Sequence, residues 1–360
     1  MTRALARMAA SCAAAVLALS LTAGPASADG PWHTVALPFF WDHSSLLDVA
    51  AAAPDQVWIS GKQGEICVQV APMTPCLIYR AGNPVVRRWD GSGWREYPIQ
   101  GWSGQGSIRQ VAAGAGQTWI LGRQETAGAY LARFDGSAFV PEAGPSGGSI
   151  QVLRAGPAGV WAGTSVAAET GDSLYRRSGG GWTGTPIPED LRYVNDVKAF
   201  TATDAWAVGQ TEPPRHTYGS PEHPALAHWD GNSWTSVLPH RESGPKARIV
   251  AVAPSGPGRA WVVTRGEIAH WDGTGWTAAP APEGTSELQD VAVDGAGAVW
   301  VTARMSGPPR LGLFRYENGT WHEVVLDSVT GATDIAASPG GAAWALARDE
   351  DGKPSLITTD

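Results

Sequence analysis

Residues 228–239 read HWDGNSWTSVLP, and 42 residues further along the chain residues 270–282 read HWDGTGWTAAPAP. In each stretch an apolar run leads into Trp-Asp-Gly, and a second run follows from a tryptophan five residues after the first. Asp-Gly between two such runs is a β-hairpin signal, because Asp bonds the turn backbone and Gly adopts a positive φ. Each stretch therefore predicts a hairpin whose two tryptophans pair across the strands.

The same hairpin recurs elsewhere in the chain, and the residues at its two tryptophan positions are always five residues apart. Four further copies lie at residues 85–99, 131–143, 174–188 and 313–326. Some of their outer positions are not tryptophan: Phe134 and Phe139, Arg177, and Tyr316 take its place. The chain thus contains six complete copies of one hairpin.

A second kind of hairpin precedes each copy. It reads LDVAAAAPDQVWISG at residues 47–61, with a first strand rich in Ala and Val and a tryptophan in the second strand. Seven tryptophans, spaced 39 to 61 residues apart, mark its copies: Trp58, Trp119, Trp161, Trp206, Trp261, Trp300 and Trp344. Four strands at a period of about 40–50 residues are typical of a propeller blade. Small first-strand residues suit a crowded centre, so the first strand is predicted to line the axis.

Seven first hairpins but only six second hairpins predict how the ring closes. The chain ends in SLITTD at Asp360, and the segment after Ala28 begins DGPWHT, so the two ends joined would complete the seventh second hairpin. We therefore predict an all-β chain with one domain over residues 29–360. It is a seven-bladed β-propeller of four-stranded antiparallel blades, in which the N-terminal strand completes the last blade. In a closed ring every blade packs on two neighbours.

At these residues the chain resembles the seven-bladed β-propeller proteins over nearly all of residues 29–360. The Trp-Asp pair is similar to that of a WD40 repeat, which implies protein binding. The D-G-x-x-W turn is similar to the Asp-box hairpin of sialidase-like propellers, which implies glycan chemistry. The chain departs from both: Asp-Val replaces the Gly-His of a WD40 blade, and the Ser and Asp that precede an Asp box are absent. No residue role is therefore carried over from either family.

The N-terminus has the features of a secretion signal. Arg3 and Arg7 precede an apolar run over residues 13–21, and Ala26-Ser27-Ala28 forms an A-x-A cleavage site. We predict a signal peptide over residues 1–28 and a secreted protein after cleavage near Ala28. The apolar run is shorter than the roughly 20 residues that cross a bilayer, and no later segment is apolar enough, so no membrane span is predicted.

Charge and cysteine content narrow the possible binding partners and bear on whether the chain holds a disulfide or a metal. Without Arg3 and Arg7 the chain keeps 24 basic and 34 acidic residues, a charge of −10 that disfavours nucleic-acid binding. Outside the reducing cytosol, the close pair Cys67 and Cys76 predicts a disulfide rather than a metal site. We expect a monomer, and no sequence feature requires a metal or a cofactor.

The long and varied loops all fall on one predicted face, whereas the opposite face carries short turns. Residues left over from the repeat gather on this loop-rich face, and eight of them are candidate ligand-binding residues: Trp41, His43, Trp102, Tyr193, Arg215, His216, Tyr218 and His223. Loop tryptophans also commonly pack over a neighbouring blade, and loop histidines are commonly only solvated.

Four aspartates open inner strands and form a separate group: Asp48, Asp196, Asp290 and Asp334. Buried carboxylates near the channel mouth could serve as acids or bases. Carboxylates at strand ends also cap turn backbone, and we favour this interpretation.

The leading functional hypothesis is a secreted binding protein that recognises a glycan, a peptide or another small ligand at the loop-rich face around the central channel. One alternative is a hydrolase or lyase on the same face that uses Asp42, Glu65 or the loop histidines. The chain has no complete catalytic motif such as G-x-S-x-G or H-E-x-x-H. Another alternative is a scaffold that docks a second exported protein through its turn face.

Overall fold

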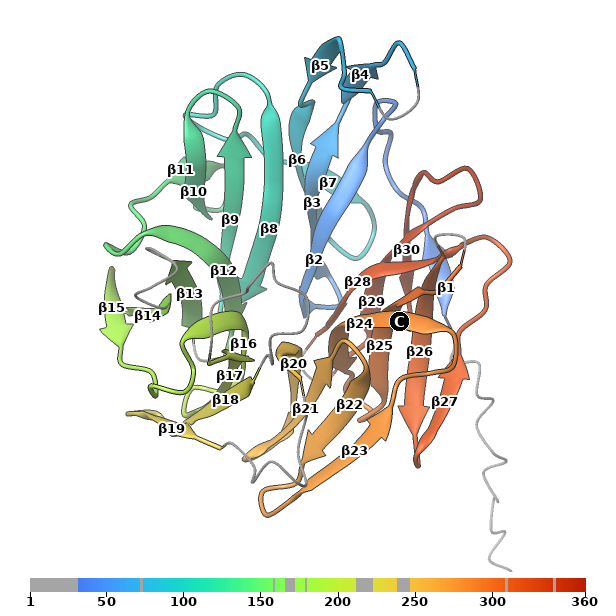
Figure 1. Cartoon of the computed structure of the whole chain (residues 1–360). Coiled ribbons are helices and arrows are strands. Elements are labelled where there is room, and N and C mark those ends of the chain that lie inside the picture. Colours follow the sequence, from blue (N-terminus) through green and yellow to red (C-terminus); the bar gives the residue numbers. More distant parts are fainter. Residues whose placement is uncertain are drawn as a thin grey trace, which may run out of the picture.

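The structure is a computed structural model, and it describes residues 32–71, 74–157, 159–165, 172–178, 180–211, 223–237, 247–307, 310–338 and 341–360. These residues form seven four-stranded antiparallel sheets arranged as the blades of a ring (Figure 1). The predicted seven-bladed β-propeller is therefore confirmed. Within the described ranges no helix is long and apolar enough to cross a membrane.

The blades follow one another along the chain, each with its first strand innermost. Blade 1 contains β2 (Ser45–Ala53), β3 (Gln56–Gln63), β6 (Asn83–Trp89) and β7 (Trp94–Glu96). Blade 2 contains β8 (Gly106–Gly114), β9 (Gln117–Gln124), β10 (Gly128–Phe134) and β11 (Phe139–Pro141). Blade 3 contains β12 (Ser149–Gly156), β13 (Gly159–Ser165), β14 (Asp172–Ser178) and β15 (Gly181–Thr185).

The remaining blades repeat this order. Blade 4 contains β16 (Tyr193–Thr201), β17 (Asp204–Gln210), β18 (Pro224–Trp229) and β19 (Trp234–Ser236). Blade 5 contains β20 (Ile249–Gly256), β21 (Arg259–Thr264), β22 (Glu267–Trp271) and β23 (Trp276–Pro280). Blade 6 contains β24 (Thr285–Val293), β25 (Val299–Met305), β26 (Leu311–Glu317) and β27 (Thr320–Glu323). Blade 7 contains β28 (Gly331–Ala337), β29 (Ala343–Arg348), β30 (Pro354–Thr358) and β1 (His33–Val35).

The ring closes as the repeat predicted. Strand β1 pairs antiparallel with β30, with Thr34 opposite Ile357, so the two ends of the described chain share blade 7 (Figure 1). Trp32, just before β1, is buried against Trp300 of blade 6 with ring centroids 5.0 Å apart.

The outer hairpins also have the predicted register. Trp89 lies opposite Trp94, and the corresponding pairs in the other copies are Phe134 with Phe139, Arg177 with Trp182, Trp229 with Trp234, Trp271 with Trp276, and Tyr316 with Trp321. In the turn after Trp89, Asp90 Oδ1 accepts hydrogen bonds from the backbone of Ser92 and Gly93, and Gly91 has a φ of 90°. The Asp-Gly pair therefore forms these turns for the predicted reason.

Candidate functional site

Every inner strand has an irregularity at the same place, where one extra residue interrupts the pairing with the second strand. In β2 this residue is Leu47, between Leu46 and Asp48. Corresponding register shifts occur at Ile108/Gln110, Ile150/Val152, Val194/Asp196, Ile249/Ala251, Leu288/Asp290 and Ala332/Asp334. Such bulges bend a strand and redirect its side chains. The residue after each bulge therefore occupies an equivalent position in all seven blades.

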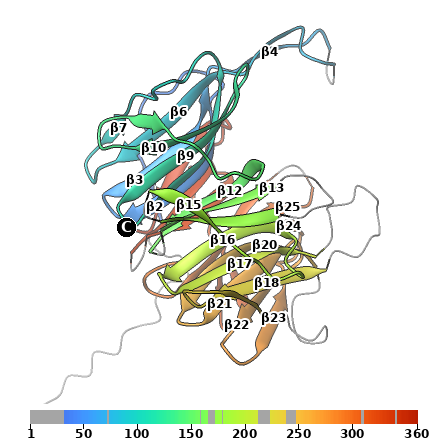
Figure 2. The same ribbon diagram turned by 90° about the vertical axis from the view of Figure 1, so that its left-hand side faces the viewer.

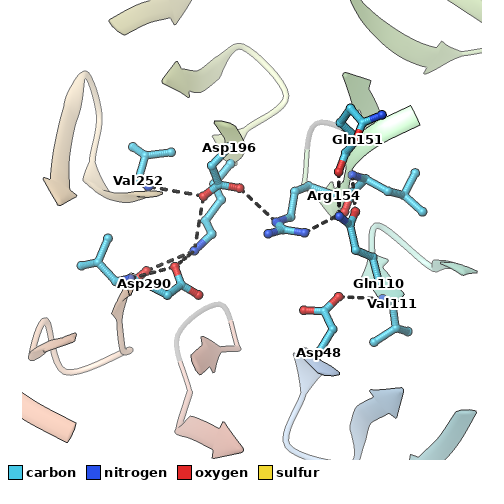
Figure 3. Close-up of polar contacts among 11 residues, drawn as sticks. Asp48, Gln110, Val111, Gln151, Arg154, Asp196, Val252 and Asp290 are labelled. Carbon is cyan, nitrogen blue, oxygen red and sulfur yellow. Dashed lines mark hydrogen bonds and ion pairs between the residues drawn. The ribbon is translucent and has the colours of Figure 1, made fainter. Parts of the chain in front are cut away.

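At four of these positions the side chain joins its blade to the next one. Each accepts a hydrogen bond from a backbone N–H of the next inner strand: Asp48 Oδ2 from Val111 (2.7 Å), Gln110 Oε1 from Leu153 (2.7 Å), Asp196 Oδ2 from Val252 (3.3 Å) and Asp334 Oδ2 from Val49 (2.8 Å). Figure 3 shows the first and third of these contacts. The expectation that the inner-strand aspartates cap turns is corrected: three of them cap the neighbouring blade's strand. Asp290 Oδ1 instead accepts from the next residue, Val291 (2.7 Å).

Two residues further along each inner strand, five blades have alanine and two have a cation. The alanines are Ala50, Ala112, Ala253, Ala292 and Ala336. In blade 3 this position holds Arg154, whose Nε lies 3.0 Å from Asp196 Oδ1 (Figure 3). In blade 4 it holds Lys198, whose Nζ lies 3.2 Å from Asp290 Oδ1 and 3.7 Å from Asp196 Oδ2. Arg154 and Lys198 were missed in the sequence, although two cations interrupting an alanine position are visible once the repeats are aligned.

We call this group the channel ring: Asp48, Arg154, Asp196, Lys198, Asp290 and Asp334. Burial raises the pKa of Asp48 and of Asp334, and the charge of Asp48 raises the pKa of Asp334 further. Burial by itself lowers the pKa of Lys198, but Asp290 and Asp196 outweigh it and leave that pKa raised. The ring therefore holds a stable ammonium in blade 4 and carboxyls with a raised proton affinity in blades 1 and 7.

A cavity of about 580 Å³ occupies the channel beside this ring. Its walls are the inner strands, mainly through Ala, Val and Gly, and its other end is formed by the turns between first and second strands. Ala115 and Phe200 line it there and are exposed, so the cavity reaches the turn face. Among the described residues no group of three or more His, Cys, Asp or Glu is placed to hold a metal ion.

Ser255 adds a polar group to the cavity wall. Its Oγ lies 3.3 Å from Nε2 of His270, whose ring stacks on Trp261 with centroids 4.3 Å apart. Burial lowers the pKa of His270, which keeps the imidazole neutral near pH 7. Among the described residues no carboxylate is hydrogen-bonded to the other ring nitrogen, so the pair lacks the orienting group of a catalytic triad.

The structure describes five of the eight predicted ligand-binding residues, and they differ in how far they are exposed. Trp41 is 53% exposed and His43 is exposed with a φ of 54°. Trp102 is partly buried and packs against Tyr130, with ring centroids 5.0 Å apart. Tyr193 is buried and His223 is partly buried.

Arg215, His216 and Tyr218 lie outside the described residues. None of the five predicted residues that are described lines the channel cavity. A ligand site at the loop-rich face therefore stays a prediction. Of the carboxylates considered for an enzyme, Glu65 lies 2.6 Å from Lys62 Nζ in an ion pair.

Blade 1 carries an arm made of β4 (Ile66–Val68) and β5 (Ile78–Arg80), which pair with each other alone. Figure 2 shows the end of the arm at β4 projecting beyond the blades. The predicted Cys67–Cys76 disulfide is confirmed, with Cα atoms 5.2 Å apart. Five of the ten exposed large hydrophobic side chains in the described ranges lie on the arm: Ile66, Val68, Val70, Leu77 and Tyr79. Apolar surface of this kind marks contact surfaces.

Comparison with known proteins places the fold but no family. No protein-family model and no curated protein matches the sequence. Among solved structures, YCF48 bound to the D1 peptide is 16% identical, with a TM-score of 0.57 over 91% of this chain and 96% of that chain. The WD40 propeller domain of Doa1 is 11% identical, with a TM-score of 0.56 over 91% and 96%. A catalytically inactive virginiamycin B lyase from Staphylococcus aureus with quinupristin is 14% identical, with a TM-score of 0.56 over 91% and 99%. These likenesses show a shared propeller fold.

Proposed function

We propose that this chain is an exported binding protein that takes a small ligand into its central channel. The observation that carries the proposal is the 580 Å³ cavity, which has small apolar walls and the channel ring at one end. Ligand sites are typically concave, about 300–1,000 Å³ in volume, and mostly apolar with a few convergent polar groups. The cavity fits this description.

Structures of the same fold are consistent with a binding role. One is bound to a peptide and another is held with quinupristin, so propellers of this architecture accommodate such ligands. Export is supported by the signal-like residues 1–28 and by the Cys67–Cys76 disulfide, which suits an oxidising compartment. Within this proposal the exposed Trp41 and the apolar arm are the surfaces available to a larger partner, such as a glycan or a second exported protein.

A ligand screen on wild-type and two variant proteins tests the siting. Thermal shift would be measured with a panel of amines, carboxylic acids, sugars and short peptides. Ala50→Phe fills the cavity at a position where blades 3 and 4 carry Arg and Lys, so the backbone there accepts a long side chain. Trp41→Ala is the control on the loop-rich face. A ligand at a hundred times its Kd stabilises the folded state by about 2.7 kcal/mol.

We expect active compounds to lose their stabilising effect in Ala50→Phe and to keep it in Trp41→Ala. The reverse pattern would move the site to the loop-rich face. A panel without any active compound would count against small-ligand binding as such.

A further inference from the structure

The channel ring contains more carboxyls than cations, and the cations are unevenly placed. Arg154 pairs with Asp196, and Lys198 pairs with Asp290 and Asp196. In the part of the chain that the structure describes, no basic side chain lies within 4.0 Å of the carboxyl of Asp48 or Asp334. The carboxyls of blades 1 and 7 thus face the cavity without an ion-pair partner.

Asp48 and Asp334 are also held in fixed positions next to each other. Each uses Oδ2 to accept a backbone N–H from the next blade, at 2.7 Å and 2.8 Å. Both carboxyls line the same cavity, and Asp334 accepts from the N–H of Val49, the residue directly after Asp48, so the two lie on adjacent inner strands. Because the inner strands β2 and β28 fix both groups, a ligand would meet two preorganised acceptor oxygens.

The cavity wall offers further groups that a ligand could contact. Trp161 and Ser338 both line the cavity and are only 1% exposed. Among the described residues, Trp161 Nε1 and Ser338 Oγ have no hydrogen-bond partner, which is uncommon for buried polar atoms. Phe200, 38% exposed, adds an aromatic ring toward the turn face. The cavity therefore suits a molecule with an apolar body and a charged end.

We infer that the channel binds an organic amine, with its ammonium group held between the carboxyls of Asp48 and Asp334. The inference rests on the proposed function and names its ligand class. An anion is disfavoured because Arg154 and Lys198 are already paired, and it would face the unpaired carboxyls. A neutral ligand would leave both carboxyls without a cationic partner.

Binding in this arrangement releases one proton. At any pH where the raised pKa leaves one proton on the carboxyl pair, the pair carries one negative charge before binding, and the ammonium keeps its own protons. When the ammonium enters, the proton on the pair leaves to solvent. Both carboxylates then accept hydrogen bonds from the ammonium. The raised pKa of the pair supports this exchange. The other charged groups facing the pair are Arg154, Asp196, Lys198 and Asp290, whose three ion pairs stay intact.

Isothermal titration calorimetry tests the inference on the full mature chain. The probes are 2-phenylethylamine, its neutral counterpart 2-phenylethanol, and calcium or magnesium chloride alone. We expect the amine to bind at least tenfold more tightly than the alcohol. Its affinity should rise up to tenfold per pH unit while the pair is protonated and level off above the pair's pKa. Titrations in buffers of different ionisation enthalpy should give release of about one proton per amine.

Two variants locate the effect. Asp48→Asn and Asp334→Asn each keep an oxygen for the backbone N–H, and each should weaken amine binding at least tenfold and abolish proton release. Asp55→Asn, an exposed carboxyl in the turn after β2, is the matched control and should change neither.

The outcomes separate the two proposals. Equal binding of amine and alcohol that Ala50→Phe removes would overturn the amine assignment and leave channel binding standing. Binding of a metal salt alone that depends on Asp48 and Asp334 would assign the site to an inorganic cation and overturn the inference. If the amine does not bind the wild-type protein, the inference is wrong.

Discussion

The pKa of aspartate is shifted in opposite directions at two kinds of position in this protein. In the outer turns, Asp272 Oδ1 accepts backbone hydrogen bonds from Thr274 and Gly275. The bond from Gly275 is the largest cause that lowers the pKa of Asp272 to about 2. In the channel, burial raises the pKa of Asp334. Hydrogen bonds to a solvated carboxylate favour its charged form, whereas burial disfavours it.

This difference predicts opposite effects of Asp→Asn on stability. The folded state binds the Asp334 proton more tightly than the unfolded chain, so that carboxyl's contribution falls as pH rises from about 3.8 through the raised pKa. Asn does not titrate, so Asp334→Asn does not suffer this loss. As the pH rises from 4 to 8, the free energy of unfolding of the variant should increase by about 1 kcal/mol relative to that of wild type, the size of a common single-site effect. Urea unfolding at pH 4, 6 and 8 measures it.

Asp272→Asn is the matched comparison for the same measurement. The contribution of the Asp272 carboxylate is fully present above pH 3.8 and is lost as pH falls toward 2. This variant should therefore be less stable than wild type at pH 4 to 8, and the difference should vanish near pH 2. Parallel pH profiles for the two variants would contradict a raised pKa of the Asp334 carboxyl in the channel.

At the scale of elements, the second-strand tryptophans join neighbouring blades. Trp161 of β13 packs against Trp229 and Trp234 of the next blade's outer hairpin, with centroids 5.5 Å and 5.3 Å apart. Trp58 packs in the same way against Phe134 and Phe139. Aromatic pairs in this edge-to-face geometry contribute about 0.5–1.5 kcal/mol beyond their burial. The aromatic repeat therefore encodes contacts between blades as well as hairpins.

The arm is the element that stands apart from this packing. Since β4 and β5 pair only with each other, the Cys67–Cys76 disulfide should stabilise the arm locally. Replacing both cysteines by serine should leave the ring's Tm within about 1 °C of wild type, because a change of that size corresponds to less than about 1 kcal/mol for a domain of this size. Protease should cleave the arm faster in this variant than in wild type, and mass spectrometry of the fragments would show where the cuts fall. A large drop in Tm would mean that the arm supports the ring.

At the scale of the whole molecule, stability depends on joining the two ends of the chain. β1 supplies the outer strand of blade 7, and Trp32 beside it is 6% exposed and packs on Trp300 of blade 6. Blade 7 therefore depends on residues more than 300 positions away in sequence. Because every blade of a closed propeller packs on two neighbours, weakening this junction destabilises the entire ring.

Trp32→Ala should lower the free energy of unfolding by about 3–5 kcal/mol, as for other buried tryptophans. Urea unfolding followed by circular dichroism measures the change. Trp41→Ala removes an exposed tryptophan nearby and should cost less than about 0.5 kcal/mol. Equal effects of the two substitutions would show that ring closure does not depend on Trp32.

The sequence by itself determined the repeat, and through it the architecture. The five-residue aromatic spacing, the Asp-Gly turns and the missing seventh hairpin are local patterns, and hairpin geometry turns them directly into strands and register. Blade number, closure by the segment at Trp32 and the Cys67–Cys76 bridge could therefore all be predicted.

Only the tertiary structure decided which residues meet in the channel. Asp48 and Asp334 are 286 positions apart in sequence and become neighbours because the ring closes between blades 7 and 1. The bulge that sets the position of each ring residue leaves no signal in a single repeat, and Arg154 and Lys198 look like ordinary strand residues. The burial of a channel side chain and its ion-pair partners are set by residues of other blades. The sequence pattern of one blade carries no information about those residues.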